Sequence, residues 1–300
     1  MRGGFLSRLF RCFGRAREMK KPKHPGLAGI IGQPLDHSLS PFIHNLGFSL
    51  LKLPYVFVKI EIPPAKLSRT IGALADLGFI GANVTMPHKE KVVALIDSLS
   101  PEAEAVGAVN TLVVKGKKIK GYNTDIDGFA RSLELRMPGR KFPTAAIFGA
   151  GGAAAAVAYA LFKHFDTRNF HFICRNWRKA KKNLSGKPFF AGLLWADFVD
   201  WEDAERAVRA SDVVVNATPV GMNDKKSFPV SPAAFRPGLA ACDLIYNPPL
   251  TPFMRLVKKG GAKTIGGLEM LVQQAAVSFR LWTGEELPVE KVRQELLSSL

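Results

Sequence analysis

A short stretch of this chain, GANVTMPHKE at residues 81–90, gathers polar side chains directly after an apolar run that has the character of a strand. It places Asn83, Thr85 and Lys89 around a proline. Proteins with alternating strands and helices keep their ligand-binding groups at such strand ends. A lysine there can stabilise a developing negative charge and donate a proton. We expect Lys89 in the first turn of a helix over residues 89–99, where most lysines only reach into water.

Hydroxyl, amide and carboxylate side chains mark further positions of the same kind. Ser38 and Ser40 precede a predicted helix, and hydroxyls and amides at a helix start suit a bound carboxylate. Ser40 before Pro41 also fits a purely structural N-cap with proline as the first helical residue. Asn110 ends the run AVGAVN, and Asp125 in GYNTDIDGF fits a cap of the next helix equally well. Each residue alone therefore has a structural explanation.

A glycine-rich turn joins an apolar strand to a helix in AAIFGAGGAAAAVAYALF, residues 145–162. Glycines allow a tight turn and the close approach of a pyrophosphate, whose charge the helix N-terminus stabilises. Alanine is an accepted variant of the third glycine. Because a strand precedes the turn and a helix follows it, the turn predicts dinucleotide binding. The predicted contacts are Gly149, Ala150, Gly151, Gly152 and Ala153.

Basic residues follow the second strand of the same half, where the adenosine ribose of a dinucleotide would lie. An NAD site carries an acid there to accept from the ribose 2'-hydroxyl, but CRNWRKAKK, residues 174–182, has none. Arg175, Arg178 and Lys179 suit a 2'-phosphate instead, since cations pair with phosphate oxygens. The sequence therefore favours NADP over NAD. The alternative is a solvated basic helix start.

A third run of this half, DVVVNATPVGM at residues 212–222, reads as a buried strand that ends in Asn216 and Thr218. A nicotinamide ribose would occupy the crevice beside this strand end. Alone, the run is only a strand followed by a loop, so its interpretation depends on the other motifs.

Short strand-like runs alternate with helical segments along two stretches of the chain. The first carries LAGII, YVFVKIEI and GANVT, with helices at about 41–51 and 65–77 between them. The second begins at TAAIF and continues through NFHFIC, DVVVNA, ACDLIY and AKTIG, and a hairpin-like segment with its turn at 115–117 separates the two. Such alternation indicates βαβ units and a mainly parallel sheet. The fold class is therefore α/β with two halves. The last helix, at about 268–282, has no sheet of its own to follow, and we expect it to pack back on the first half.

Length and composition limit the classes of function. With 300 residues, 47% of them hydrophobic and 22% charged, the chain is long enough for two globular domains. No apolar run reaches the roughly 18 residues that cross a bilayer. Cys12, Cys174 and Cys242 match no metal or paired-thiol spacing, which fits free thiols in a reducing, cytoplasmic compartment. We expect no metal site.

The net charge of +17 is unevenly placed. Residues 1–24 hold eight Lys or Arg against Glu18 alone, or +7, which leaves +10 on the rest. We expect this basic tail to be disordered, with contact to an anionic membrane surface or a transit-type leader as alternatives. Basic motifs interleaved with aromatic residues and helix-turn-helix patterns are absent. Nucleic acid is therefore not expected as a partner.

Taken together, the motifs resemble the signature series of the shikimate dehydrogenase family. In chain order they are GxPxxHSLSP, GANVTMPHK, GAVNT, NTD, GAGGAA, NATPVGM, CDLIYNP and GGLEMLVQQA, and they cover about residues 27–285. The resemblance implies two domains with the active site in the cleft between them. A substrate-binding catalytic domain would comprise residues 25–125 and 267–300, and a Rossmann-like NADP-binding domain residues 126–266.

The resemblance also implies a reaction, the reversible NADPH-dependent reduction of 3-dehydroshikimate to shikimate in aromatic amino acid biosynthesis. Lys89 would stabilise the developing alkoxide and donate its proton, and Asp125 would hold the lysine in its ammonium form. The implied substrate contacts are Ser38, Ser40 and Tyr246 at the carboxylate and Thr85, Asn110 and Gln274 at the ring hydroxyls. The implied cofactor contacts are the glycine-rich turn with Arg175, Asn176, Lys179, Asn216, Thr218 and Gly267.

Two departures from the family pattern concern the NTD and cofactor motifs. Many members carry glycine immediately after the aspartate of the NTD motif, whereas this chain continues with Ile-Asp-Gly at residues 126–128. The family's Asn-Arg-Thr triplet is replaced by Cys-Arg-Asn at residues 174–176. The second departure leaves the details of 2'-phosphate recognition open. The alternatives are an NAD-dependent quinate/shikimate dehydrogenase and a catalytically silent dinucleotide-binding regulator, and retention of Lys89 and Asp125 disfavours the regulator. A small-molecule substrate is expected as partner, and a homodimer is left open.

Overall fold

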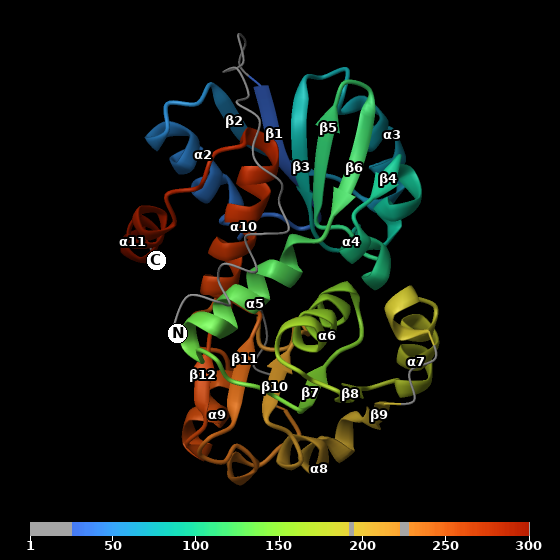
Figure 1. Ribbon diagram of the computed structural model, residues 1–300, viewed down its shortest axis with the longest axis vertical. Helices are drawn as coiled ribbons and strands as arrows, with labels where there is room; N and C mark the ends of the chain where they lie inside the picture. Colours follow the sequence, from blue (N-terminus) through green and yellow to red (C-terminus); the bar gives the residue numbers. More distant parts are fainter. Residues whose placement is uncertain (1–25, 192–194, 223–227, 300) are drawn as a thin grey trace.

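The computed structural model describes residues 26–191, 195–222 and 228–299 of the chain. The basic tail predicted at residues 1–24, including Cys12, lies outside these ranges. The described chain forms two lobes, each built on a six-stranded sheet. Helix α5 (Thr124–Arg136) lies between the lobes, and α10 (Gly267–Thr283) runs from there into the first lobe (Figure 1). None of the helices in the described ranges is long and apolar enough to span a membrane.

The first lobe is a mixed sheet with the strand order β2-β1-β3-β5-β6-β4. β2, β1 and β3 are parallel, whereas the predicted hairpin, β5–β6, runs antiparallel beside β3. Gly116, with a φ of 59°, lies in the hairpin turn at the predicted position. The elements of this lobe are β1 (Gly26–Gly32), α2 (Ser40–Leu50), β2 (Tyr55–Glu61), η1 (Pro64–Lys66), α3 (Leu67–Ala73), β3 (Phe79–Val84), η2 (Lys91–Leu95), β4 (Ser98–Leu99), α4 (Pro101–Val106), β5 (Thr111–Lys115) and β6 (Lys118–Tyr122).

The second lobe is a parallel sheet with the strand order β12-β11-β10-β7-β8-β9. The strand order reverses between β7 and β10, and open α/β sheets bind ligands outside the carboxyl ends of their strands at such a point. The elements of this lobe are β7 (Thr144–Phe148), α6 (Gly152–His164), β8 (Asn169–Cys174), α7 (Trp177–Ser185), η3 (Pro188–Phe190), β9 (Ala196–Asp200), η4 (Trp201–Asp203), α8 (Ala204–Arg209), β10 (Val213–Asn216), η5 (Pro232–Ala234), β11 (Ala240–Asp243), α9 (Pro252–Gly260) and β12 (Lys263–Ile265).

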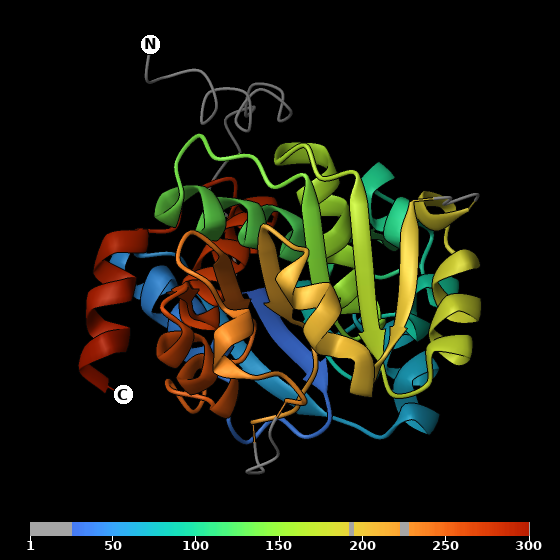
Figure 2. The same cartoon turned by 90° about the horizontal axis from the view of Figure 1, so that it is seen from below.

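The central strands of each sheet are buried on both faces, which explains their continuous apolar runs. Successive residues of a strand point to opposite faces. In β1, Ile30 joins the core formed with α2 and α10, while Ile31 joins the core formed with α3. In β7, Ile147 packs with α5 and α6, and Phe148 packs with α8 and α9 on the other face. Figure 2 shows the sheet of the second lobe with these helices around it. The two sheets therefore form rigid platforms whose strand ends carry the loops of the site.

Helix α10 follows the last strand of the second lobe but packs into the core of the first. Phe279 and Trp282 lie in one buried cluster with Ala28 and Phe57, and Trp282 Nε1 donates to the carbonyl oxygen of Leu112 at 2.8 Å. The final helix, α11 (Val289–Ser299), contributes Val292 and Leu296 to the same cluster. The chain thus crosses between the lobes through α5 and α10, and the domain boundaries at residues 125/126 and 266/267 stay a prediction.

The α-helix expected over residues 89–99 is wrong. Lys89 and Glu90 lie in a turn, η2 is a short 3-10 helix, and β4 already begins at Ser98. Val92 and Val93 are β-branched and therefore weak helix formers, and Val92 is fully buried in the core beneath the turn. Lys89 is consequently not placed at the unfavourable end of an α-helix dipole.

Both structural caps that competed with a functional interpretation are also wrong. Ser40 is the first residue of α2, whose N-cap is Leu39 and makes no side-chain cap bond. Asn123, and not Asp125, occupies the N-cap position of α5, and its side chain donates to the carbonyl oxygen of Ala108. The geometry of the preceding loops sets these helix starts, so the Ser40 hydroxyl and the Asp125 carboxylate are not used as caps.

Gly128 allows α5 and α10 to approach each other closely. A methyl group at this position would lie 2.6 Å from Gln274 Cβ and 2.9 Å from the Gln274 nitrogen. Gly128→Ala is therefore expected to destabilise the fold by about 1 to 3 kcal/mol, as overpacking usually does. It should also lower activity, because Gln274 lines the cavity described below.

The matched control for this prediction is Gly72→Ala on α3, where no atom of the described chain lies within 4 Å of an added methyl group. Alanine is the better helix former, so this variant should be neutral or slightly more stable. Thermal and urea unfolding of the two variants measure the difference. Equal melting temperatures would show that the close approach at Gly128 has no energetic consequence.

Candidate active site

A cavity of about 310 Å³ lies between the two lobes. Its walls are the loops that follow β1, β3, β10 and β11, together with the starts of α5, α6 and α10. Residues predicted for substrate and for cofactor therefore meet in one place. The predicted residues that line the cavity are Ser38, Ser40, Thr85, Lys89, Asn110, Asp125, Ala153, Thr218, Tyr246, Gly267 and Gln274.

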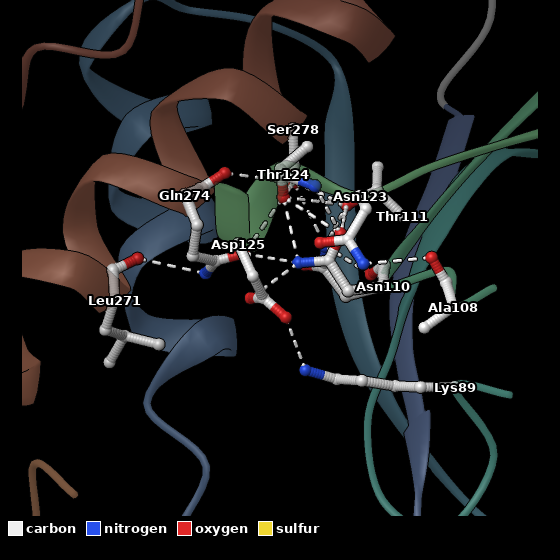
Figure 3. Close-up of polar contacts among 11 residues, drawn as sticks. Lys89, Ala108, Asn110, Thr111, Asn123, Thr124, Asp125, Leu271, Gln274 and Ser278 are labelled. Carbon is white, nitrogen blue, oxygen red and sulfur yellow. Dashed lines mark hydrogen bonds and ion pairs between the residues drawn. The ribbon is translucent and has the colours of Figure 1, made fainter. Parts of the chain in front are cut away.

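Lys89 and Asp125 form an ion pair in this cavity, with 2.6 Å between Lys89 Nζ and Asp125 Oδ2. Their side chains are 19% and 9% exposed, so the pair is shielded from bulk water but accessible from the cavity. The other carboxylate oxygen accepts from Asn110 Nδ2 at 2.8 Å (Figure 3). Asp125 lies in the first turn of α5, where the helix dipole favours its negative charge. The aspartate is thus fixed, and it orients the ammonium group of the lysine.

A buried network of polar side chains supports the pair from behind (Figure 3). The Asn110 side chain accepts from the Thr124 backbone nitrogen at 2.7 Å and donates to the Thr124 hydroxyl at 3.0 Å. Thr111 and Thr124 each lie within hydrogen-bond distance of Ser278 Oγ on α10, at 2.9 and 3.1 Å. Gln274, one turn earlier on α10, donates from Nε2 to the Leu271 carbonyl oxygen at 2.9 Å. The network ties the first lobe, α5 and α10 together.

Hydroxyl-bearing residues of both lobes line the cavity. Ser38 and Ser40 come from the loop and helix start after β1, and Tyr246 comes from the loop after β11 in the second lobe. Tyr246 Oη lies 3.5 Å from the carbonyl oxygen of His37, next to Ser38. Burial raises the pKa of the Tyr246 phenol, so it is a hydrogen-bond donor at neutral pH. All three residues thus bring hydroxyl groups, which can donate to an anionic group, to the cavity lining.

The glycine-rich turn has the form that a dinucleotide pyrophosphate requires. Gly149 has a φ of 104°, which favours glycine. Helix α6 begins at Gly152 with Gly151 as an extended N-cap and no side-chain cap bond, so its first N–H groups are not used by a cap. A methyl group at Gly151 would meet no atom of the described residues within 4 Å. The helix start is thus both open and rich in donors, which fits a phosphate group.

The basic residues predicted for the 2'-phosphate lie at the start of α7, outside the cavity lining. Arg175, Asn176 and Lys179 are exposed, and Asn176 Oδ1 accepts from the Lys179 backbone nitrogen at 3.0 Å as the N-cap of α7. Asn183 Nδ2 on the same helix donates to the carbonyl oxygen of Ala150 at 3.1 Å. The basic cluster is therefore attached to the glycine-rich turn, at the end of β8 where an adenosine ribose is bound in such folds.

Asn216 lies behind the cavity wall and does not line it. It is fully buried, and its Oδ1 accepts from the Thr218 hydroxyl at 2.7 Å. Its Nδ2 donates to Asp243 Oδ1 at 3.0 Å. The structure therefore brings Thr218 to the cavity and leaves Asn216 to orient it. The other predicted residues outside the lining are Gly149, Ala150, Gly151 and Gly152.

Asp243, the last residue of β11, joins the end of β10 to the loop between β11 and α9. Its carboxylate accepts from Asn216 Nδ2 at 3.0 Å, from the Ile245 nitrogen at 3.0 Å and from the Thr251 hydroxyl at 2.5 Å. Burial raises the pKa of this carboxyl group to about 6, although the three hydrogen bonds act in the opposite direction. Because Ile245 precedes Tyr246, the carboxylate also fixes the loop that carries the tyrosine.

Asp243→Asn is expected to change how stability depends on pH. An unfolded aspartate has a pKa of about 3.9. Because the folded pKa is about 6, the folded state binds one more proton than the unfolded state between about pH 4 and pH 6. The contribution of Asp243 to the free energy of unfolding therefore grows as the pH falls through 6 and is lost as the pH rises. Asparagine does not titrate. The melting temperature of the wild type minus that of the variant should therefore increase from about pH 7.5 to about pH 5. A difference that does not vary with pH would contradict this account.

Several residues of the site were not assigned a role from the sequence. Asn83 lines the cavity, and its Oδ1 is buried without a hydrogen-bond partner among the described residues. Thr111 and Thr124 are adjacent to Asn110 and Asp125 in the GAVNT and NTD motifs, so the motifs could have identified them. Ser278 carries no local signal, since only the packing of α10 brings it to the network.

Comparisons with known proteins agree with this geometry. Residues 30–112 match the model of the shikimate dehydrogenase substrate-binding domain, and residues 267–297 match that of the shikimate 5'-dehydrogenase C-terminal domain. A shikimate dehydrogenase (NADP(+)) from Methanopyrus kandleri is 40% identical over 283 residues, which is 91% of this chain and 96% of the relative.

Two solved structures have the same fold. Shikimate 5-dehydrogenase from Thermus thermophilus, in complex with NADP(H) and shikimate, is similar with a TM-score of 0.81 and 33% identity, over 92% of this chain and 100% of that one. Quinate dehydrogenase from Corynebacterium glutamicum, in complex with NAD, has a TM-score of 0.81 and 31% identity over the same shares of the two chains. Sequence motifs, fold and relatives agree, and the chain belongs to the shikimate dehydrogenase family.

Proposed function

We propose that this chain catalyses the reversible NADPH-dependent reduction of 3-dehydroshikimate to shikimate in the shikimate pathway. The observation that carries the proposal is the shielded ion pair of Lys89 and Asp125, which opens to a cavity between a hydroxyl-lined lobe and a glycine-rich turn. Reduction of a ketone needs a hydride on one side of the carbonyl and an acid at its oxygen. This cavity offers a place for both.

NADPH, held on the second lobe, supplies the hydride when it is bound. Lys89 Nζ stabilises the negative charge that develops on the substrate oxygen and donates the proton to it. Asp125, with its second oxygen held by Asn110, keeps the ammonium group aimed into the cavity. In the oxidation of shikimate the same pair accepts the hydroxyl proton.

The remaining polar residues of the cavity suit the substrate. Ser38, Ser40 and Tyr246 are proposed to bind the carboxylate, because all three line the cavity and carry hydroxyl groups that can donate to an anion. The proposed contacts of the ring hydroxyls are Thr85, Asn110 and Gln274, with Lys89 and Asp125. A charged group at one end and hydroxyls at the other would fix which carbon faces the nicotinamide.

The residues of the second lobe suit NADP. The open N-terminus of α6 with its glycine-rich turn is proposed to bind the pyrophosphate, and Arg175 with Lys179 the 2'-phosphate. Asn176 would act through the cap of α7, which holds the Lys179 backbone in place. The proposed contacts on the nicotinamide side are Ala153, Thr218 and Gly267, which line the cavity.

An assay with shikimate or quinate, each with NADP or NAD, tests the proposal by the absorbance of the reduced nicotinamide. We expect the highest kcat/KM with shikimate and NADP. A preference for quinate and NAD would support the activity named for the Corynebacterium glutamicum relative instead. No turnover with any pair would favour the dinucleotide-binding regulator.

Location and assembly are proposed from the sequence. Cys174 and Cys242 are buried free thiols, which fits the proposed cytoplasmic location. A homodimer is proposed as the form to test, by light scattering of the purified protein.

A further inference from the structure

An ion pair between a buried lysine and an exposed glutamate joins the two lobes directly beside Lys89. Lys187, between α7 and η3 of the second lobe, donates from Nζ to Glu90 Oε1 of the first lobe at 2.9 Å. The Lys187 side chain is only 8% exposed, whereas that of Glu90 is 41% exposed. Burying a lysine is costly unless its ammonium group is paired, so this contact constrains the positions of both side chains.

Both ends of the contact are held by the backbone. The Lys187 nitrogen donates to the Leu184 carbonyl oxygen at 2.9 Å, and the Lys187 carbonyl oxygen accepts from the Phe190 nitrogen at 2.9 Å. On the other side, the carbonyl oxygen of Lys89 accepts from the Val109 nitrogen at 2.8 Å. The peptide between Lys89 and Glu90 is therefore fixed to its own lobe at Lys89 and to the second lobe at the Glu90 carboxylate.

The glycine-rich turn packs against the same two residues. A methyl group at Gly152 would lie 3.8 Å from Lys89 Cβ and 3.9 Å from Glu90 Cγ. The turn that carries Lys89 thus lies close to the predicted pyrophosphate site. The Glu90–Lys187 ion pair is a second contact that holds this turn against the second lobe. The position of Lys89 relative to the cofactor lobe depends on these contacts.

We propose that Lys187 is a positioning residue that, through Glu90, sets the place of the Lys89 ammonium group relative to the cofactor lobe. The proposal rests on the proposed function, because it concerns the geometry between a proton donor on one lobe and a hydride donor on the other. A displacement of about 1 Å at a reacting group can cost up to about a hundredfold in rate. Lys187 does not line the cavity, so its effect should appear in kcat.

A second inter-lobe ion pair provides a matched control. Lys163 on α6 donates to Glu102 on α4 at 3.0 Å, and their side chains are 36% and 32% exposed. This pair also joins the two lobes, but neither residue is adjacent to Lys89 in sequence or lines the cavity. If kcat depended only on the number of ion pairs between the lobes, removing either pair would lower kcat equally.

The experiment compares Lys187→Met, Lys187→Arg, Glu90→Gln and the double variant Lys187→Met/Glu90→Gln with Lys163→Met. We expect Lys187→Met to lower kcat for shikimate oxidation with NADP about tenfold, with KM for both substrates within about twofold. Glu90→Gln should have the same effect, and the double variant no further effect. Lys187→Arg should restore most of kcat, and Lys163→Met should keep kcat within about twofold of wild type. A Lys187→Met variant with wild-type kcat, or an equal loss in Lys163→Met, would overturn the proposal.

Hydrogen exchange provides a readout that does not need turnover. The turn that carries Lys89 has backbone bonds from the His88 nitrogen to the Thr85 carbonyl oxygen and from the Val92 nitrogen to the His88 carbonyl oxygen, each 2.9 Å long. These amides should exchange faster in Lys187→Met and in Glu90→Gln but not in Lys163→Met. Unchanged exchange in both would overturn the positioning role. Absence of shikimate oxidation by the wild type would instead count against the proposed function. The exchange rates would still show whether Lys187 and Glu90 hold the turn that carries Lys89.

Discussion

Lys89→Ala is expected to lower kcat for shikimate oxidation by about two orders of magnitude or more, with a smaller change in KM. The lysine is the cationic partner of Asp125 in the shielded cavity, and its removal takes away both the stabilisation of the alkoxide and the proton donor. Because these contributions arise mainly in the transition state, the loss should appear in kcat. Steady-state kinetics with NADP at saturating shikimate measure it.

The control for this variant is Lys91→Ala. Lys91 is exposed, lies two residues further along the same segment and does not line the cavity. Its replacement should leave kcat unchanged, and the melting temperatures of both variants should be close to that of the wild type. A folded Lys89→Ala variant that retains more than half of the wild-type kcat would show that Lys89 is not the proton donor.

Arg175→Ala is expected to weaken NADP binding roughly tenfold to a hundredfold, because the loss of one charge-assisted phosphate contact costs about 1.5 to 3 kcal/mol. NAD lacks the 2'-phosphate, so its binding should change little. Arg175 is exposed at the start of α7, next to the glycine-rich turn, and is therefore available to a ligand. The ratio of kcat/KM for NADP to that for NAD measures the effect.

Asn176→Asp should shift this ratio further toward NAD. Aspartate is as good an N-cap as asparagine, so the bond to the Lys179 nitrogen that starts α7 is retained. The new carboxylate repels a 2'-phosphate and offers an acceptor to a ribose hydroxyl. Lys182→Ala, at the last turn of the same helix, is the control and should leave the ratio unchanged. If the wild type prefers NAD, or if Arg175→Ala does not change the ratio of kcat/KM for NADP to that for NAD, the basic cluster does not bind the 2'-phosphate and is only a solvated helix start.

Local sequence patterns predicted those parts of the fold that depend on neighbouring residues. The strand TAAIF is confirmed at Thr144–Phe148, since a short apolar run between turns is typical of a buried strand. NFHFIC is confirmed at Asn169–Cys174, where buried Phe170 and Phe172 alternate with polar residues as in a strand. The glycine-rich turn lies directly between β7 and α6 as expected. Helix starts were less predictable, because Ser40 and Asp125 are cap-forming residues that the preceding loops place one or two positions inside their helices.

The contacts that complete the candidate site could not be predicted, because they join residues far apart in the chain. The hydroxyls of Thr124 and Ser278 lie 3.1 Å apart although 154 positions separate them. The ion pair of Glu90 and Lys187 spans 97 positions and joins two lobes. Motif spacing locates individual groups such as Lys89, whereas the packing of α10 and α7 decides which partners reach them.

The most direct test of the proposed reaction follows the hydride itself. The purified protein is incubated with 3-dehydroshikimate and NADPH that carries deuterium at the transferred position of the nicotinamide, and the product is examined by NMR and mass spectrometry. The proposed function predicts shikimate with one deuterium on the carbon that was the ketone, formed by the wild type and lost in Lys89→Ala. Shikimate without deuterium, or unchanged 3-dehydroshikimate with a folded wild-type protein, would contradict it.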